Sequence, residues 1–110
     1  MTTPEPAPNT RYDNKPFLRL LDAYVLAATG NLDPVADSTL TSMEPQFHKA
    51  FGQTGSWRSI VERRMNFRPG MDRAIREVWD KGRAKFLQAN GKQPDPREFT
   101  RHFVDTNFPH

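Results

Sequence analysis

The sequence predicts an all-α fold, a single compact bundle of five or six short helices, and three observations support this prediction. Apolar residues recur at intervals of three and four, the period of one helix face, and no segment shows the alternation of a strand. Proline stands at the start of several predicted helices and glycine at the end of others. Finally, 110 residues with eight Phe and two Trp provide one core but not two.

The N-terminal stretch, residues 1–12, is predicted to be a disordered tail, and residues 13–110 form the helical domain. Pro4, Pro6 and Pro8 alternate with small or polar residues, and no apolar anchor is evident in this stretch. We therefore expect the core to be built without these residues.

The first helix is expected to follow Asn14 as N-cap, with Pro16 in its first turn and Gly30 just beyond its end. Its predicted buried stripe is Phe17, Leu20, Leu21, Tyr24, Val25 and Ala28. Leu18 and Leu26 fall outside this stripe, so they are candidate contacts for self-association. A monomer or weak homodimer is expected.

Two short helices, 34–43 and 45–51, should follow with a bend between them. Asp33 is a capping residue before the first-turn Pro34, and Pro45 cannot occupy the interior of a helix. The inward residues of the two helices are predicted to be Val35, Leu40, Met43, Phe47, Ala50 and Phe51.

Ser56 should cap a fourth helix, and one arginine within that helix departs from its pattern. The predicted inward face is Trp57, Ile60, Val61 and Met65. Arg64 falls within the same arc, which leaves three interpretations. Either the helix frays there, or the aliphatic stem of Arg64 covers the core while its guanidinium reaches water, or Arg64 stands in a pocket that binds an anion.

The stretch from Gly70 to Asn90 is predicted to be the central core helix. Its apolar residues are Met71, Ala74, Ile75, Val78, Trp79, Gly82, Phe86 and Ala89. They fall in one arc around Val78 and Gly82, with Trp79 as the largest buried group and Gly82 as a notch for the close approach of another helix.

A last helix should begin at Asp95 and Pro96, an N-cap acid before a first-turn proline. Phe99, Phe103 and Thr106 are predicted to point inward. Phe108 should pin the C-terminal end of this helix to the core.

Positive charge is concentrated in the middle of the chain. Residues 58–92 hold ten basic and four acidic residues, a net +6, whereas residues 1–57 hold four basic and six acidic residues. Such a segment attracts an acidic protein surface or a phosphate backbone. The candidate partner-binding residues are Arg58, Arg63, Arg68, Arg83 and Lys85.

No motif for catalysis, a metal or a cofactor is present, so an enzyme is not expected. The chain has no Cys, and its three His lack the spacing of metal ligands. No apolar run approaches the roughly 20 residues that span a bilayer, and no secretory signal is evident. A cytoplasmic location without membrane association is therefore expected.

These features favour a small helical binding module that engages an acidic protein partner through its basic central surface. One alternative is a nucleic-acid binder using residues 56–92, either non-specific or of the helix-turn-helix type with 45–51 and 57–65 as its two helices. A second alternative is a helical subunit of a homo-oligomer.

Overall fold

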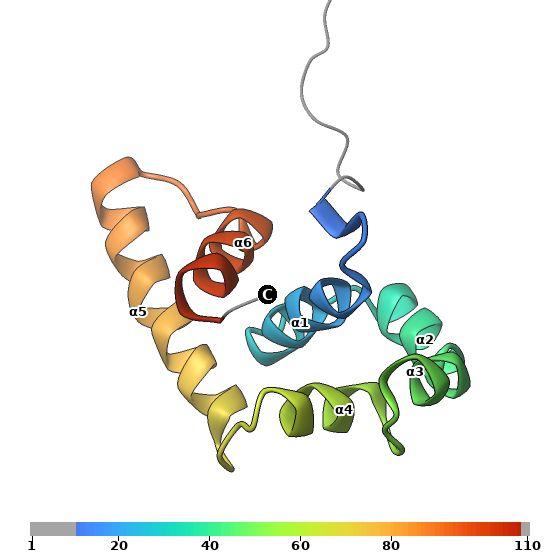
Figure 1. The fold of residues 1–110 in the computed structure, drawn as a ribbon. Coiled ribbons are helices and arrows are strands. Elements are labelled where there is room, and N and C mark those ends of the chain that lie inside the picture. The colour runs from blue at the N-terminus through green and yellow to red at the C-terminus, as the bar shows by residue number, and fades with distance from the viewer. Residues whose placement is uncertain (1–10, 109–110) are drawn as a thin grey trace, which may run out of the picture.

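Residues 11–108 of the computed structural model are described here, and within them the chain forms six helices and no strand (Figure 1). The helices are α1 (Pro16–Ala28), α2 (Pro34–Ser42), α3 (Glu44–Phe51), α4 (Trp57–Arg64), α5 (Met71–Asn90) and α6 (Pro96–Asn107). The predicted all-α fold is confirmed. Of the predicted tail, residues 1–10 lie outside the described residues.

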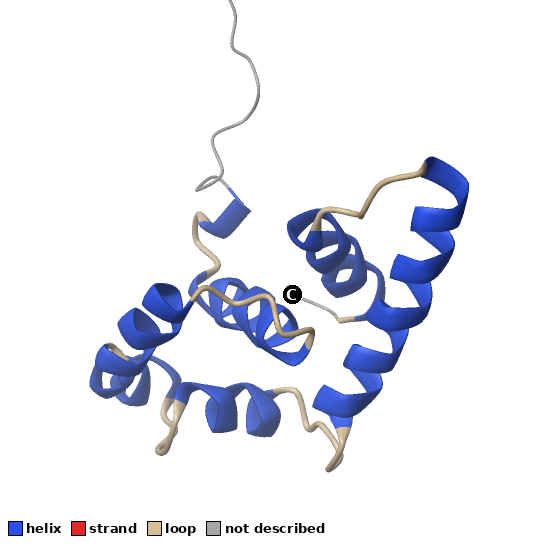
Figure 2. Ribbon diagram, turned by 180° about the vertical axis from the view of Figure 1, so that it is seen from behind, coloured by secondary structure: helices blue, strands red, loops and turns tan. Residues whose placement is uncertain are grey.

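Helix α1 occupies the middle of the molecule, and the rest of the chain passes around it (Figures 1 and 2). Helices α4, α5 and α6 all pack on α1, while α2 and α3 stand on its other side. Seven consecutive or nearly consecutive residues of α1 are buried: Leu18, Leu20, Leu21, Asp22, Ala23, Tyr24 and Val25. A helix that is apolar on several faces needs several neighbours, and this one has them.

The prediction that the Gly70–Asn90 helix is the central one is wrong. In α5 only Ile75 and Trp79 are buried, and every residue from Asp80 to Lys92 is exposed. Trp79, 6% exposed, does belong to the interior as predicted. The apolar arc of α5 is regular, but three of its eight residues are Ala or Gly, which offer little surface for a neighbour to cover.

Other predicted positions need correction. Leu18 is only 2% exposed, because α1 has neighbours beyond its predicted stripe, and a buried Leu18 is not available for self-association. Leu26 is half-buried. Val35, Ala50 and Thr106 were predicted to point inward but are exposed, Val35 at 72%, because no element covers those faces of their short helices.

The helix starts follow the predicted capping chemistry with one exception. Asp33 accepts a hydrogen bond from the Val35 amide at 2.8 Å, and Asp95 accepts one from the Arg97 amide at 2.9 Å. Asn14 is not the cap of α1: Lys15 holds that position, and Asn14 adopts a left-handed turn conformation with φ of 61°. Asparagine is one of the few residues that tolerate this conformation.

The domain begins earlier than predicted, because Arg11 and Tyr12 bind the buried carboxylate of Asp22. Arg11 donates to Asp22 from Nε at 2.7 Å and from Nη2 at 2.9 Å, and the Tyr12 hydroxyl donates at 2.9 Å. Arg11 also bonds Asp105 on α6 at 3.1 Å. The hydrogen bond to Asp22 raises the pKa of Arg11 above its usual value. These polar contacts fasten the chain before α1 to both α1 and α6.

Aromatic side chains close the opposite side of the core. Phe67, in the turn before α5, contacts Tyr24 with ring centroids 5.5 Å apart and Phe108 at 5.1 Å. Phe108 also meets Phe103 edge-on at 5.6 Å. The predicted role of Phe108 in pinning the end of the last helix is confirmed.

We expect the folded state to lose stability above about pH 10, because two tyrosines are held neutral. Burial, followed by the charge of Asp22, raises the pKa of Tyr12 to about 12. Burial and the hydrogen bond to Glu62 also raise the pKa of Tyr24. In the unfolded chain both phenols ionise near pH ~10, so the stabilisation is complete below that pH and declines as the pH rises towards the folded-state values.

Urea unfolding measured at about pH 8 and about pH 11 checks this expectation. The variant carrying Tyr12→Phe and Tyr24→Phe should lose less stability between the two pH values than the unsubstituted protein. An equal loss in both proteins would assign the alkaline sensitivity to other groups, such as lysines.

Candidate binding surface on helix α5

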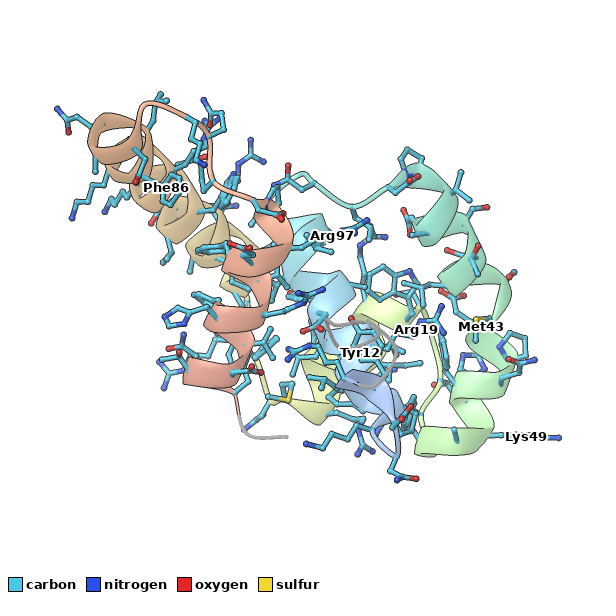
Figure 3. All side chains as sticks on the ribbon, turned by 90° about the horizontal axis from the view of Figure 1, so that it is seen from above. Tyr12, Arg19, Met43, Lys49, Phe86 and Arg97 are labelled. Carbon is cyan, nitrogen blue, oxygen red and sulfur yellow. The ribbon has the colours of Figure 1, made fainter. Side chains whose placement is uncertain are left out.

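The C-terminal half of α5 leaves the body of the molecule and exposes apolar side chains. Figures 1 and 2 show this half running out to a loop that returns to α6. Phe86 is 38% exposed and Leu87 41% exposed, and Val78, at 46%, lies further back on the same helix. Figure 3 shows Phe86 at this far end. Val78 and Leu87 are nine positions apart and so face opposite sides of α5, which leaves Phe86 as the exposed apolar residue that borders a cleft.

A cleft of about 240 Å³ lies beside Phe86, between α5 and the start of α6. Its apolar walls are Trp79, Gly82, Phe86, Pro94 and Phe99, and its charged margin is Arg83, Asp95 and Glu98. Trp79 and Phe99 form its rigid base, with ring centroids 5.0 Å apart in an edge-on contact. The loop that makes the far wall turns at Gly91, whose φ of 72° suits glycine, and ends at the Asp95 cap of α6.

Gly82 keeps this cleft open. A Cβ placed on Gly82 would meet no atom within 4 Å, apart from its own helix backbone and chain neighbours. The prediction that another helix approaches closely at this glycine is therefore wrong, although the notch itself exists. The cleft occupies the place where that helix was expected.

Positive side chains surround the exposed half of α5. Residues 80–92 carry four basic residues and one acidic residue, a net +3: Lys81, Arg83, Lys85 and Lys92 against Asp80. The Asp80 carboxylate forms ion pairs with two arginines, with Arg76 Nε at 3.6 Å and with Arg83 Nη2 at 3.9 Å. Both pairs are about half exposed, where an ion pair contributes little and water remains in contact with the charges. Arg83 and Lys85, two of the predicted partner-binding residues, thus lie beside the cleft or on the same exposed segment.

The three other predicted partner-binding residues lie elsewhere. Arg58, on α4, pairs with Asp37 of α2 at 3.2 Å, and its guanidinium lies 4.7 Å from the Trp57 ring centre. Arg63 donates a hydrogen bond to the Thr54 carbonyl and so closes the loop before α4. Arg68 is exposed in the turn between α4 and α5. The structure therefore does not gather the five predicted residues at one place.

The helix pair predicted as a helix-turn-helix is α3 followed by α4, separated by residues 52–56. Arg64, the third arginine of α4 after Arg58 and Arg63, lies over the rings of Phe17 and Phe51, at 4.8 Å and 5.1 Å. All three arginines of the proposed recognition helix therefore contact groups of this protein. The ion pair of Arg58 and the hydrogen bond of Arg63 occupy donors that phosphates or base edges would need, whereas the ring contacts of Arg64 leave its N–H groups available.

Sequence reasoning located the aromatic residues of the cleft but not their exposure. Phe86 shares the apolar phase of Trp79, and a periodic pattern does not reveal which of two residues in phase is covered. The cluster of Lys81, Arg83 and Lys85 around Phe86 is the one signal that could have indicated an exposed segment, since a buried helix face tolerates few unpaired cations.

Within residues 11–108, no three His, Asp or Glu side chains are placed to hold a metal ion. His48 instead forms a hydrogen bond through Nε2 with the Gly55 carbonyl at 2.8 Å. None of the helices formed by these residues is both long and apolar enough to cross a membrane. Comparison of the chain with protein-family models, curated proteins and solved structures found no match.

Proposed function

We propose that this protein is a small binding module that holds an acidic segment of a partner protein along the C-terminal half of α5. One apolar side chain of that segment enters the cleft beside Trp79. The observation that carries the proposal is the combination of an uncovered apolar cleft and a net charge of +3 on the same exposed stretch, residues 80–92.

The two features contribute differently to binding. Lys81, Lys85 and Lys92 attract an acidic segment over a distance and orient it along the helix, which chiefly raises the association rate. The margin of the cleft itself carries Arg83 against Asp95 and Glu98, so the cleft takes an apolar side chain and not a carboxylate. The cleft supplies the desolvated contact that slows dissociation, as anchor pockets do in protein interfaces. At about 240 Å³ the cleft is below the roughly 300 Å³ at which small-molecule sites begin, so a single inserted side chain suits it better than a whole ligand.

A protein segment suits this surface better than a nucleic acid strand. Single-stranded nucleic acids bind through several exposed aromatic faces on which successive bases stack. Among the large apolar side chains of residues 11–108 that are prominently exposed, Phe86 is the one aromatic residue, and Val78 and Leu87 are aliphatic. Non-specific phosphate contact by the same cations is therefore expected to be weaker than about 1 μM at physiological salt.

Short synthetic peptides test the proposal directly. The first peptide carries several Glu and one central Phe, the second has Ser in place of that Phe, and the third has Lys in place of every Glu. We expect the first to bind at least about tenfold more tightly than either of the others, and its affinity to fall with added salt. Random duplex and single-stranded oligonucleotides are titrated in parallel.

Matched variants locate the contact. Gly82→Gln places a polar side chain in the cleft, and Phe86→Ser removes one of its aromatic walls. Each should lower the affinity for the first peptide by about tenfold. Val35→Ser removes an apolar side chain that is still more exposed but lies on α2, and it should leave binding unchanged. Equal binding of all three peptides, or equal effects of Phe86→Ser and Val35→Ser, would refute the proposal. Tighter binding of an oligonucleotide than of the first peptide would favour the nucleic-acid alternative.

A further inference from the structure

A second and larger groove lies at the other end of the molecule, where the start of α1 meets the ends of α3 and α4. It is open to solvent and has a volume of about 770 Å³. Ala50, one of its lining residues, follows Lys49, and Figure 3 shows Lys49 and Phe86 at opposite ends of the protein. The groove is thus separate from the α5 cleft.

The walls of this groove combine apolar side chains with cations. Pro16, Phe17, Phe51 and Met65 provide apolar surface, and Lys15 and Arg64 provide two positive charges. No carboxylate is among the described residues that line it. Two cations facing one groove without a neutralising acid create a positive potential that favours an anion.

Arg64 is held so that its hydrogen-bond donors stay available. The rings of Phe17 and Phe51 meet edge-on, with centroids 5.6 Å apart, and the guanidinium carbon lies about equally far from both. Rings contact a guanidinium without using its N–H groups. Within residues 11–108, the side chain of Arg64 makes no hydrogen bond or ion pair, in contrast to those of Arg58 and Arg63.

We propose that this groove binds a small organic oxyanion that carries an apolar ring. The oxyanion, a carboxylate or a phosphate, accepts hydrogen bonds from Arg64, with Lys15 as a second positive charge. The ring lies against Pro16, Ala50 and Met65. The guanidinium fork matches two oxygens of one oxyanion, and such charge-assisted bonds are about twice as strong as neutral ones.

The size of the groove agrees with a small-molecule ligand. Its volume of about 770 Å³ falls within the range of roughly 300 to 1,000 Å³ that is typical of such sites. This inference does not depend on the function proposed for α5, because the two sites share no lining residue. Each can fail while the other stands.

Calorimetric titration with five probes tests the inference on the full chain. Phenylacetate and adenosine monophosphate combine a ring with a carboxylate or a phosphate. Acetate and inorganic phosphate supply the anion alone, and benzyl alcohol supplies the ring alone. We expect at least one of the two combined probes to bind about tenfold or more tightly than its separate parts, and the better of the two identifies the oxyanion.

Variants then assign the site. Arg64→Gln should weaken the better probe by about tenfold, and Arg64→Lys should restore only part of that loss, because an ammonium lacks the planar fork. Lys15→Gln and Ala50→Phe test the second cation and the space for the ring without altering a buried residue, and each should also weaken binding. Arg19→Gln removes an exposed charge of α1 that does not line the groove and serves as control.

Three results would overturn the inference. The first is binding of acetate or inorganic phosphate as tight as that of the combined probes, which would indicate a charged surface without a ligand site. The second is an equal loss of affinity in Arg64→Gln and Arg19→Gln. The third is no binding of either combined probe. Thermal unfolding of each variant separates loss of the site from loss of the fold.

Discussion

Leu21→Ala is expected to lower the free energy of unfolding by about 3 to 5 kcal/mol. Leu21 is 0% exposed and lies on α1, around which the other helices are arranged, so its removal leaves a cavity that several elements border. Domains of this size are stable by only about 5 to 15 kcal/mol, so the variant should lose a large part of its stability. Urea unfolding monitored by circular dichroism measures the effect.

Val78→Ala is the matched control, since Val78 is the centre of the apolar arc of α5 and yet is 46% exposed. Val78→Ala should lower the free energy of unfolding by about 0.5 kcal/mol, the usual effect of a surface substitution. A loss from Val78→Ala as large as that from Leu21→Ala would mean that α5 is the central helix after all.

Arg11→Ala is expected to cost about 3 kcal/mol, because it leaves the carboxylate of Asp22 without its charged partner. The side chain of Asp22 is only 5% exposed, and Arg11 gives it two of its three side-chain hydrogen bonds. This cost lies at the lower end of the usual range for a broken buried pair, since Arg11 itself is 18% exposed. The measurement is the same urea unfolding experiment.

Adding Asp22→Asn to Arg11→Ala should recover part of the lost stability, because an amide is cheaper to bury than a carboxylate. Arg76→Ala, which breaks the exposed pair with Asp80, is the control and should cost less than about 1 kcal/mol. If Arg11→Ala cost no more than Arg76→Ala, the chain before α1 would contribute little to the domain.

The local elements could be predicted from the sequence because their causes are local. A proline in the first turn marks where three helices begin: Pro34 of α2 and Pro96 of α6, each preceded by an aspartate N-cap, and Pro45 of α3, two residues after the N-cap Met43. The burial of Trp57, Ile60 and Val61 on α4 also follows from their spacing. The N-cap of α1 was not predictable in this way, since Lys15 makes no side-chain capping bond.

The candidate sites were predictable only in part. Arg64 was notable in the sequence because it is a charged residue on the predicted apolar face of its helix. The structure places it over two aromatic rings beside a groove. The α5 cleft was indicated by Gly82 and its aromatic neighbours, but it was interpreted as a packing notch. From the sequence, Arg58 and Arg63 were expected to be available to a partner. Their contacts within this protein could not be predicted, because Asp37 lies on another helix and Thr54 lies in a loop.

The sequence alone was enough to predict that this chain is helical, where most helices start and stop, and which residues share a face. These properties depend on hydrogen bonds and side-chain contacts within about four residues. The packing of the helices was needed to show that α1 and not α5 is central, that Leu18 is buried while Phe86 is exposed, and that Arg11 binds the buried Asp22. Each of these outcomes depends on which helices pack against one another. That packing is set by the total apolar area buried over the whole chain, and a pattern within one helix does not reveal it.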